Sequence, residues 1–118
     1  MKYLCLIYTD EQKVNAMPPH EVEIVVNECL EHCERLRANG QLIASARLGS
    51  VASAATVRTQ NGGAFVTDGP FAETKEQLGG FYLIEARDLN EAIRIASHIP
   101  PGRLGCVEVR PISDHDLQ

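Results

Sequence analysis

Two kinds of apolar pattern alternate along the chain and predict helices and strands in turn. Over residues 20–38, apolar side chains recur with the three- and four-residue spacing of an amphipathic helix, and Asn39-Gly40 is suited to end it. A second helix is predicted from Asp88, which forms a box-like cap with Glu91, to about residue 99. Each helix has one apolar side and is therefore expected to pack against a sheet.

Shorter runs of apolar and β-branched residues, bounded by turn residues, predict strands. The predicted strands are 3–8, 41–48, 55–59, 64–67, 81–86 and 104–110. Asn61-Gly62, between the third and fourth, indicates a hairpin. Residues 10–19 are predicted to form a connection whose final Pro18-Pro19 suits the entrance of a helix.

The order of these elements is a βαββαβ core with an inserted hairpin, the ferredoxin-like α+β plan. Both helices are expected on one face of an antiparallel sheet, yet 3–7 and 81–84 are apolar at every position. A sheet with two apolar faces, and helices for only one, exposes a surface of the kind that marks an interaction site. We therefore predict that two copies pack face to face as a homodimer, a dimeric α+β barrel.

Composition narrows the functional classes. The 118 residues, 44% apolar and 23% charged, suit one folded domain, predicted over 1–112 with a polar tail at 113–118. The net charge of −5 and the scattered basic residues argue against direct nucleic-acid binding and against anionic membranes. No apolar run in the sequence approaches the roughly 20 residues that span a bilayer, so we expect a cytoplasmic protein.

The four cysteines do not form a recognisable metal-binding pattern. Cys29 and Cys33 lie four residues apart around His32, but zinc sites favour closer pairs and use four ligands. On a helical projection both cysteines fall near the centre of the apolar stripe, so we interpret them as core residues. Cys5 and Cys106 are expected on neighbouring strands, also as core thiols. The sequence implies no metal and no cofactor.

The segment 67–81, TDGPFAETKEQLGGF, is more elaborate than a simple connection. The tripeptide at 68–70 predicts a turn, and Phe71 is interpreted as a hydrophobic plug. A capping-box match between Thr74 and Gln77 predicts a single helical turn at that point. Ionisable groups held on a loop of this kind are common at functional sites.

The charged residues of this segment are candidate site residues. Asp68 is either a turn former, whose carboxylate accepts local backbone N–H groups, or a functional residue at a cleft mouth. In the second case it is a general acid or base, or a hydrogen-bond acceptor for a ligand. Glu73 either stabilises the positive end of the following turn or faces a ligand. Lys75 and Glu76 are either solvated or bind a small polar ligand through their opposite charges.

The last predicted strand adds a carboxylate, because the alternation of side chains turns Glu108 toward the dimer interior. A carboxylate buried there needs a partner, such as Arg110 or Arg58, or its pKa rises. Two interpretations of Glu108 remain open, an ion pair at the dimer interface and a contact with a ligand. Tyr82 or Tyr8 could place a hydroxyl in the same space. No phosphate-binding loop, dinucleotide fingerprint or metalloprotease motif accompanies these residues.

The segment 67–81 resembles the hallmark of the DGPF branch of the YCII-related proteins. Supporting likenesses lie at 1–4, 7–8, 55–59 and 105–111, so the resemblance extends over nearly the whole chain. It implies a ferredoxin-like dimeric α+β barrel, in agreement with the sheet pattern. It also implies a link to extracytoplasmic-function sigma factors, beside which DGPF proteins are often encoded.

Proteins with the YCII fold have been proposed to be enzymes that use a histidine–aspartate pair in a cleft. The resemblance places Cys29 at or near the position of that histidine and retains Asp68, so we expect the pair to be absent here. Three hypotheses result. The first is a small molecule bound or transformed in a homodimer cleft rimmed by 67–81. The others are a non-catalytic partner or sensor module linked to transcription regulation, and a loop that only locks the dimer.

Overall fold

The computed structural model describes residues 1–113, and its centre is a four-stranded antiparallel sheet. The strands follow the order β2-β5-β1-β6, which is the ferredoxin-like order with a hairpin inserted between β2 and β5. Their bounds are β1 (Lys2–Thr9), β2 (Leu42–Arg47), β5 (Gln77–Glu85) and β6 (Gly105–Pro111). The predicted ferredoxin-like α+β fold is therefore confirmed. Of the predicted polar tail, 114–118 lies outside the described residues.

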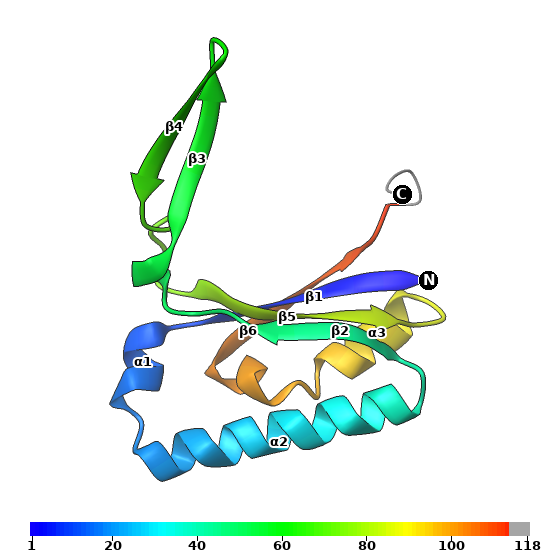
Figure 1. The fold of residues 1–118 in the computed structure, drawn as a ribbon. Helices are drawn as coiled ribbons and strands as arrows, with labels where there is room; N and C mark the ends of the chain where they lie inside the picture. Colours follow the sequence, from blue (N-terminus) through cyan, green and yellow to red (C-terminus); the bar gives the residue numbers. More distant parts are fainter. Residues whose placement is uncertain (114–118) are drawn as a thin grey trace.

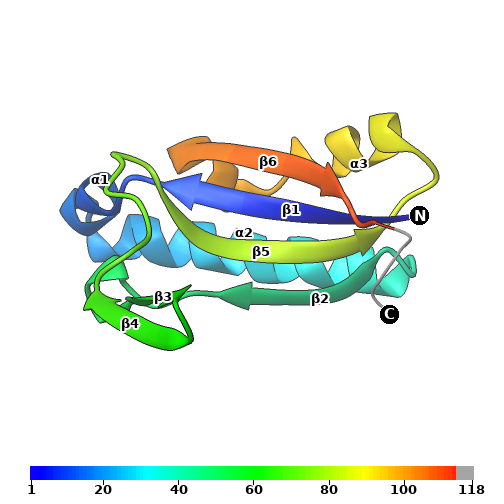
Figure 2. The ribbon, with the colours of Figure 1, turned by 90° about the horizontal axis from the view of Figure 1, so that it is seen from above.

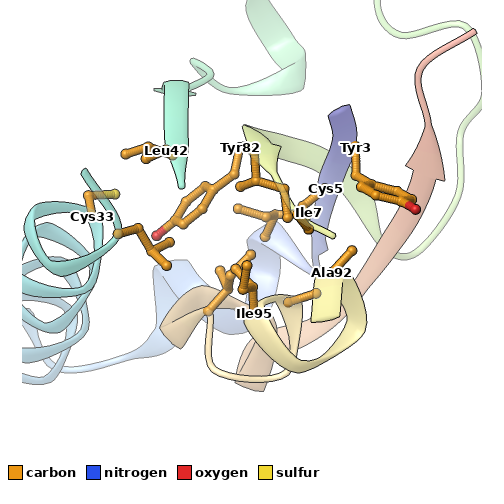
Figure 3. Packing of buried hydrophobic residues seen from close by; sticks show 13 residues of the cluster. Tyr3, Cys5, Ile7, Cys33, Leu42, Tyr82, Ala92 and Ile95 are labelled. Carbon is orange, nitrogen blue, oxygen red and sulfur yellow. The ribbon is translucent and has the colours of Figure 1, made fainter. Parts of the chain in front are cut away.

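The two long helices, α2 (Pro19–Ala38) and α3 (Leu89–Ala96), cover the same face of this sheet (Figure 1). The core lies between them and the alternate inward positions of the strands, where Tyr3, Cys5 and Ile7 of β1 face Tyr82 and Ile84 of β5. These side chains converge on α2 and α3 in the close view of Figure 3. Buried positions thus alternate along β1 and β5 as strand geometry requires, although the sequence there is apolar at every position.

Local chemistry sets the ends of these helices as predicted. Gly40 has φ of 72°, and the N–H groups of Gly40 and Gln41 donate to the last free carbonyls of α2, those of Arg37 and Leu36. At the start of α3, the Asp88 carboxylate accepts a hydrogen bond from the Glu91 N–H at 2.9 Å. Two short 3₁₀ helices, η1 (Val51–Ser53) and η2 (Pro100–Leu104), complete the connections. The helix α3 ends at residue 96, before η2, and not near residue 99 as predicted.

Two local predictions were wrong. Residues 10–19 contain a helix, α1 (Glu11–Ala16), because the Asp10 carboxylate caps it by accepting a bond from the Gln12 N–H at 3.0 Å. The expected helical turn near Thr74 does not form. The Gln77 amide instead donates to the Ala72 and Thr74 carbonyls, while the Gln77 backbone already pairs with β1 as the first residue of β5.

The inserted segment forms a separate hairpin of β3 (Ala55–Gln60) and β4 (Gly63–Asp68), as predicted. It projects away from the sheet on the side opposite the helices (Figure 1). Asn61 and Gly62 both have positive φ, 51° and 78°, as a tight two-residue hairpin turn requires. Along this hairpin Val57, Phe65 and Val66 are exposed, so the arm has apolar surface that residues 1–113 do not cover.

The second face of the sheet, which we call the open face, has no helix over it within residues 1–113. Figure 2 looks onto this face, with the strands in front of α2. The strand register aligns its side chains in rows across β2, β5, β1 and β6, of which two are Ala46-Phe81-Leu6-Glu108 and Ala44-Leu83-Leu4-Arg110. The open face is therefore apolar across three strands and charged along β6.

Candidate functional sites

A broad groove lies at the end of the open face, where the loop at 74–76 approaches β1, β6 and α1. Its volume is about 690 Å³, and its walls are Tyr8, Asp10, Lys13, Thr74, Lys75, Glu76, Cys106, Val107 and Glu108. It therefore brings together two lysine ammonium groups, two glutamate carboxylates, a tyrosine hydroxyl and the carboxylate of Asp10, which also caps α1. We call this the rim groove.

Two hydrogen bonds order the polar side of the rim groove. The Tyr8 hydroxyl donates to Glu108 Oε1 at 3.3 Å, and the Cys106 thiol donates to Glu76 Oε1 at 3.7 Å. Desolvation, followed by the negative charge of Glu108, raises the pKa of Tyr8. Desolvation and the Glu76 carboxylate likewise raise the pKa of Cys106. Both groups are therefore neutral hydrogen-bond donors near pH 7, and neither is an activated nucleophile.

The structure separates the predicted site residues into three places. Lys75, Glu76 and Glu108 line the rim groove. Asp68 and Glu73 are exposed and do not line it. Tyr82 is buried on the other side of the sheet and lines a different cavity. The acid–base role of Asp68 stays a prediction.

Backbone contacts explain why Asp68 is held at the base of the hairpin. The next residue, Gly69, has φ of 100° and donates its N–H to the Ala54 carbonyl at 2.7 Å. The Thr56 hydroxyl donates to the Gly69 carbonyl at 2.9 Å. Beyond this turn Phe71 is 78% exposed, so it is not a hydrophobic plug within residues 1–113. Its ring lies 5.5 Å from the Arg58 guanidinium, a cation–π contact.

Sequence reasoning missed Lys13 and misplaced Cys106. Lys13 enters the rim groove from α1, a helix of six residues within a segment predicted to be a connection, so its position did not follow from the sequence pattern. Cys106 was predicted to be a core thiol, but it is exposed on the open face, whereas Cys5 is fully buried on the helix face. Glu108, for its part, accepts a bond from Tyr8 instead of pairing with an arginine in the described part of the chain.

A second cavity lies beneath α2, on the helix face of the sheet. Its volume is about 320 Å³, and we call it the α2 cavity. At its floor the Cys29 Sγ lies 3.2 Å from the Tyr82 hydroxyl oxygen, and Cys33 Sγ lies 3.9 Å from the Ser45 hydroxyl. Cys33 is buried and Cys29 packs against the core, as predicted. Within residues 1–113, no three His, Cys, Asp or Glu side chains are grouped to hold a metal ion.

The fold and these two hollows define a small α+β chain of ferredoxin-like topology with an unpaired sheet face. The family model of the YCII-related domain matches residues 1–116, and the chain belongs to that family. It is 40% identical over 115 residues to an uncharacterized protein of Rhizobium meliloti (strain 1021). The aligned region covers 96% of this chain and 93% of that protein. None of the helices described in residues 1–113 combines the length and hydropathy needed to cross a membrane.

Proposed function

We propose that this protein is a cytoplasmic homodimer that binds a small polar molecule in the rim groove, bordered by the 67–81 loop. The observation that carries this proposal is the convergence of Lys13, Lys75, Glu76 and Glu108 at one end of the open face. Two copies that pack through their open faces would cover that end and turn an open groove into an enclosed cleft.

The open face supports the dimer because its apolar rows are only partly covered in one chain. Leu4, Leu6, Phe81 and Leu83 are each intermediate in exposure. Contiguous apolar surface of this kind is uncommon on a monomer and is stabilised by burial at about 25 cal/mol per Å². The same patch on two copies is self-complementary, as a twofold interface requires.

The chemistry of the rim groove favours a ligand that carries both positive and negative charge. The ammonium groups of Lys13 and Lys75 attract an anion, while Glu76 and Glu108 attract a cation. Tyr8 contributes a neutral hydroxyl beside Glu108. A zwitterion of amino-acid size fits this set, and exclusion of water by a second copy would strengthen each attraction. Asp68 and Glu73, on the exposed part of the loop, are the acid–base and ligand-binding candidates that lie outside the groove.

The dimer is tested by mass in solution. Light scattering after size exclusion should give twice the chain mass for the unaltered protein and the chain mass for Phe81→Asp, which buries a charge in the apolar rows. Ile24→Asp is the matched control, since Ile24 is 55% exposed on α2, away from the open face. A monomeric unaltered chain would reject the dimer.

The ligand site is tested by NMR titration with glutamate and with lysine as zwitterionic probes. Glu108→Gln and Lys75→Gln should each weaken binding of a probe by about tenfold, the effect of one lost charge contact. Asp68→Asn should leave binding within about twofold if its role is in a reaction step and not in binding. Equal weakening by all three variants, or no saturable shifts at Tyr8 and Glu108, would reject the site.

An apolar surface favours a second candidate function, a non-catalytic partner or sensor module. Phe71 is 78% exposed, beside the exposed apolar side chains of the β3–β4 hairpin. Such a surface suits a protein partner, and the family resemblance suggests a sigma factor. Pairwise calorimetry with sigma factors of the same organism tests this, and Phe71→Ser should abolish any binding. Binding that Phe71→Ser leaves unchanged would reject the loop as the docking surface.

A further inference from the structure

We propose that the α2 cavity is a separate binding site for a small amphipathic carboxylate, with its apolar body beneath α2 and its carboxylate at Arg47. The cavity, of about 320 Å³, lies on the opposite face of the sheet from most of the rim groove. Its volume is about twice that of a 150 Å³ cavity that accepts benzene, and it reaches the range of small-molecule sites. An eight-carbon chain is of suitable size.

The walls of the α2 cavity are mostly apolar. Above it lie aliphatic side chains of α2, and Val14 and Met17 close the end next to α1. The residues of α2 that line it are Val22, Val25, Val26, Cys29, Leu30 and Cys33. Apolar surface of this extent gains free energy when a hydrocarbon chain displaces water from it.

The floor of the cavity includes two neighbouring residues of β5 that have no side chain. Gly79 and Gly80 line it beside Tyr82. A Cβ atom on Gly80 would lie 2.9 Å from the Ala46 carbonyl oxygen, closer than real Cβ atoms approach. The pairing of β2 with β5 therefore requires glycine here. The same requirement leaves space over the sheet that a larger residue would occupy.

Electrostatics select the charge of the ligand. Arg47, at the end of β2, is the one charged residue among those that line the cavity in the described part of the chain. It is exposed and forms no ion pair within residues 1–113, so its guanidinium is free to meet an anion at the mouth. An anion held there stays partly hydrated, which keeps its desolvation cost small.

The polar groups deeper in the cavity do not repel a carboxylate. Desolvation is the main cause that raises the pKa of Cys29, and burial with the neighbouring thiols raises the pKa of Tyr82. Both groups are therefore neutral near pH 7. The positive charge of Arg47 acts on the Cys29 thiol in the opposite direction, which places the guanidinium within electrostatic reach of the floor.

Octanoate and 1-octanol test this site, because they share an apolar chain and differ in charge. We expect octanoate to bind one site per chain in calorimetric titration, with NMR shifts at Val22, Val26 and Cys29. Arg47→Gln should raise the Kd of octanoate about tenfold and that of octanol less than twofold. Arg37→Gln, which alters an exposed arginine of α2 that does not line the cavity, should change neither.

A second experiment fills the α2 cavity with a larger side chain. Val26→Phe adds a ring within the cavity and should abolish binding of both probes, while Ile24→Phe places the same ring on the exposed side of α2 and should not. Thermal unfolding would verify that both variants are folded. Binding of octanoate that survives Val26→Phe, or no saturable binding to the unaltered chain, would overturn the proposal. Neither result depends on the rim groove or on the homodimer.

Discussion

The Cys29 thiol and the Tyr82 hydroxyl lie 3.2 Å apart and join the middle of α2 to β5 across the gap between helix and sheet. Tyr82 is 2% exposed, and a buried tyrosine hydroxyl requires a hydrogen-bonding partner. The position that the family resemblance assigns to a catalytic histidine thus contributes here to a contact within the core. The contact also forms part of the floor of the α2 cavity.

Removal of the Tyr82 hydroxyl should destabilise the fold. We expect Tyr82→Phe to lower the free energy of unfolding by about 1 kcal/mol, because the bond to Cys29 is lost while the ring still fills the core. In a double-mutant cycle with Cys29→Ala, measured by urea denaturation, the two changes should be less than additive. Strict additivity would mean that the thiol and hydroxyl do not interact.

Alkaline pH should destabilise the fold through Cys5. This thiol is fully buried, and desolvation raises its pKa from 9.0 to about 11. The folded chain therefore keeps a proton that the unfolded chain releases, so stability is full below pH 9 and falls as pH rises toward 11. A difference of two pH units corresponds to about 2.7 kcal/mol.

The control for this effect is Cys5→Ala. The variant should start less stable because it leaves a small cavity, but its free energy of unfolding should fall less steeply between pH 9 and 11. Equal slopes in the two proteins, measured by urea denaturation at each pH, would contradict the role of Cys5.

The sheet was predictable from the sequence because its strands are short apolar runs bounded by turn residues. In 3–7 and 81–84 both alternating sets are apolar, which correctly indicated an inward face and an open face. The short helix α1 escaped prediction because six residues give too little periodicity to distinguish it from a loop. Its cap, Asp10, was the available signal.

A candidate site residue was predictable only where the alternation of side chains along a strand was enough to assign it to one face of the sheet. Glu108 was placed on the open face because its neighbours Val107 and Val109 face the core. The rim groove also needs Lys13 and Lys75 from two different segments, and their meeting depends on tertiary structure. Tyr82 was assigned to the wrong face because its own strand is apolar on both sides, which leaves parity ambiguous.

His32 is expected to make the fold sensitive to acid. It is 6% exposed, and its Nδ1 atom has no hydrogen-bond partner within residues 1–113. Desolvation first, then the charge of Arg35 and of His98, lowers its pKa below 6.5. The unfolded chain thus binds a proton more readily than the folded chain, and stability falls as pH drops below 6.5. Glu34 and Glu31, on the same helix, are exposed.

Replacement of this histidine tests the effect. His32→Leu removes an unpartnered buried polar atom and should raise the free energy of unfolding at pH 7 by about 1 kcal/mol. It should also flatten the loss of stability between pH 7 and 5. His20→Leu, at an exposed position near the start of α2, should leave the pH dependence unchanged. A steeper loss of stability toward acid pH in His32→Leu would contradict the assignment of this acid sensitivity to His32.

The β3–β4 hairpin is expected to open independently of the sheet. A two-stranded hairpin is marginally stable alone. Within residues 1–113, this one is held by hydrogen bonds at its base and by the contact of Arg58 with the Phe71 ring. Gly62 has φ of 78°, so Gly62→Ala strains the turn by about 1 kcal/mol. Amide exchange should accelerate about fivefold in the hairpin and stay unchanged in β1 and β5.

The neighbouring glycine provides a matched control. Gly63 does not have positive φ, and a Cβ atom there would meet the Gln60 carbonyl oxygen at an ordinary 3.6 Å, so Gly63→Ala should leave exchange nearly unchanged. Acceleration in β1 and β5 as well would show that the hairpin unfolds together with the core. If the open-face dimer forms, the hairpin lies on the same side as that interface. Its exchange in the monomeric Phe81→Asp variant would then exceed that in the dimer, because a second copy no longer covers Phe65 and Val66.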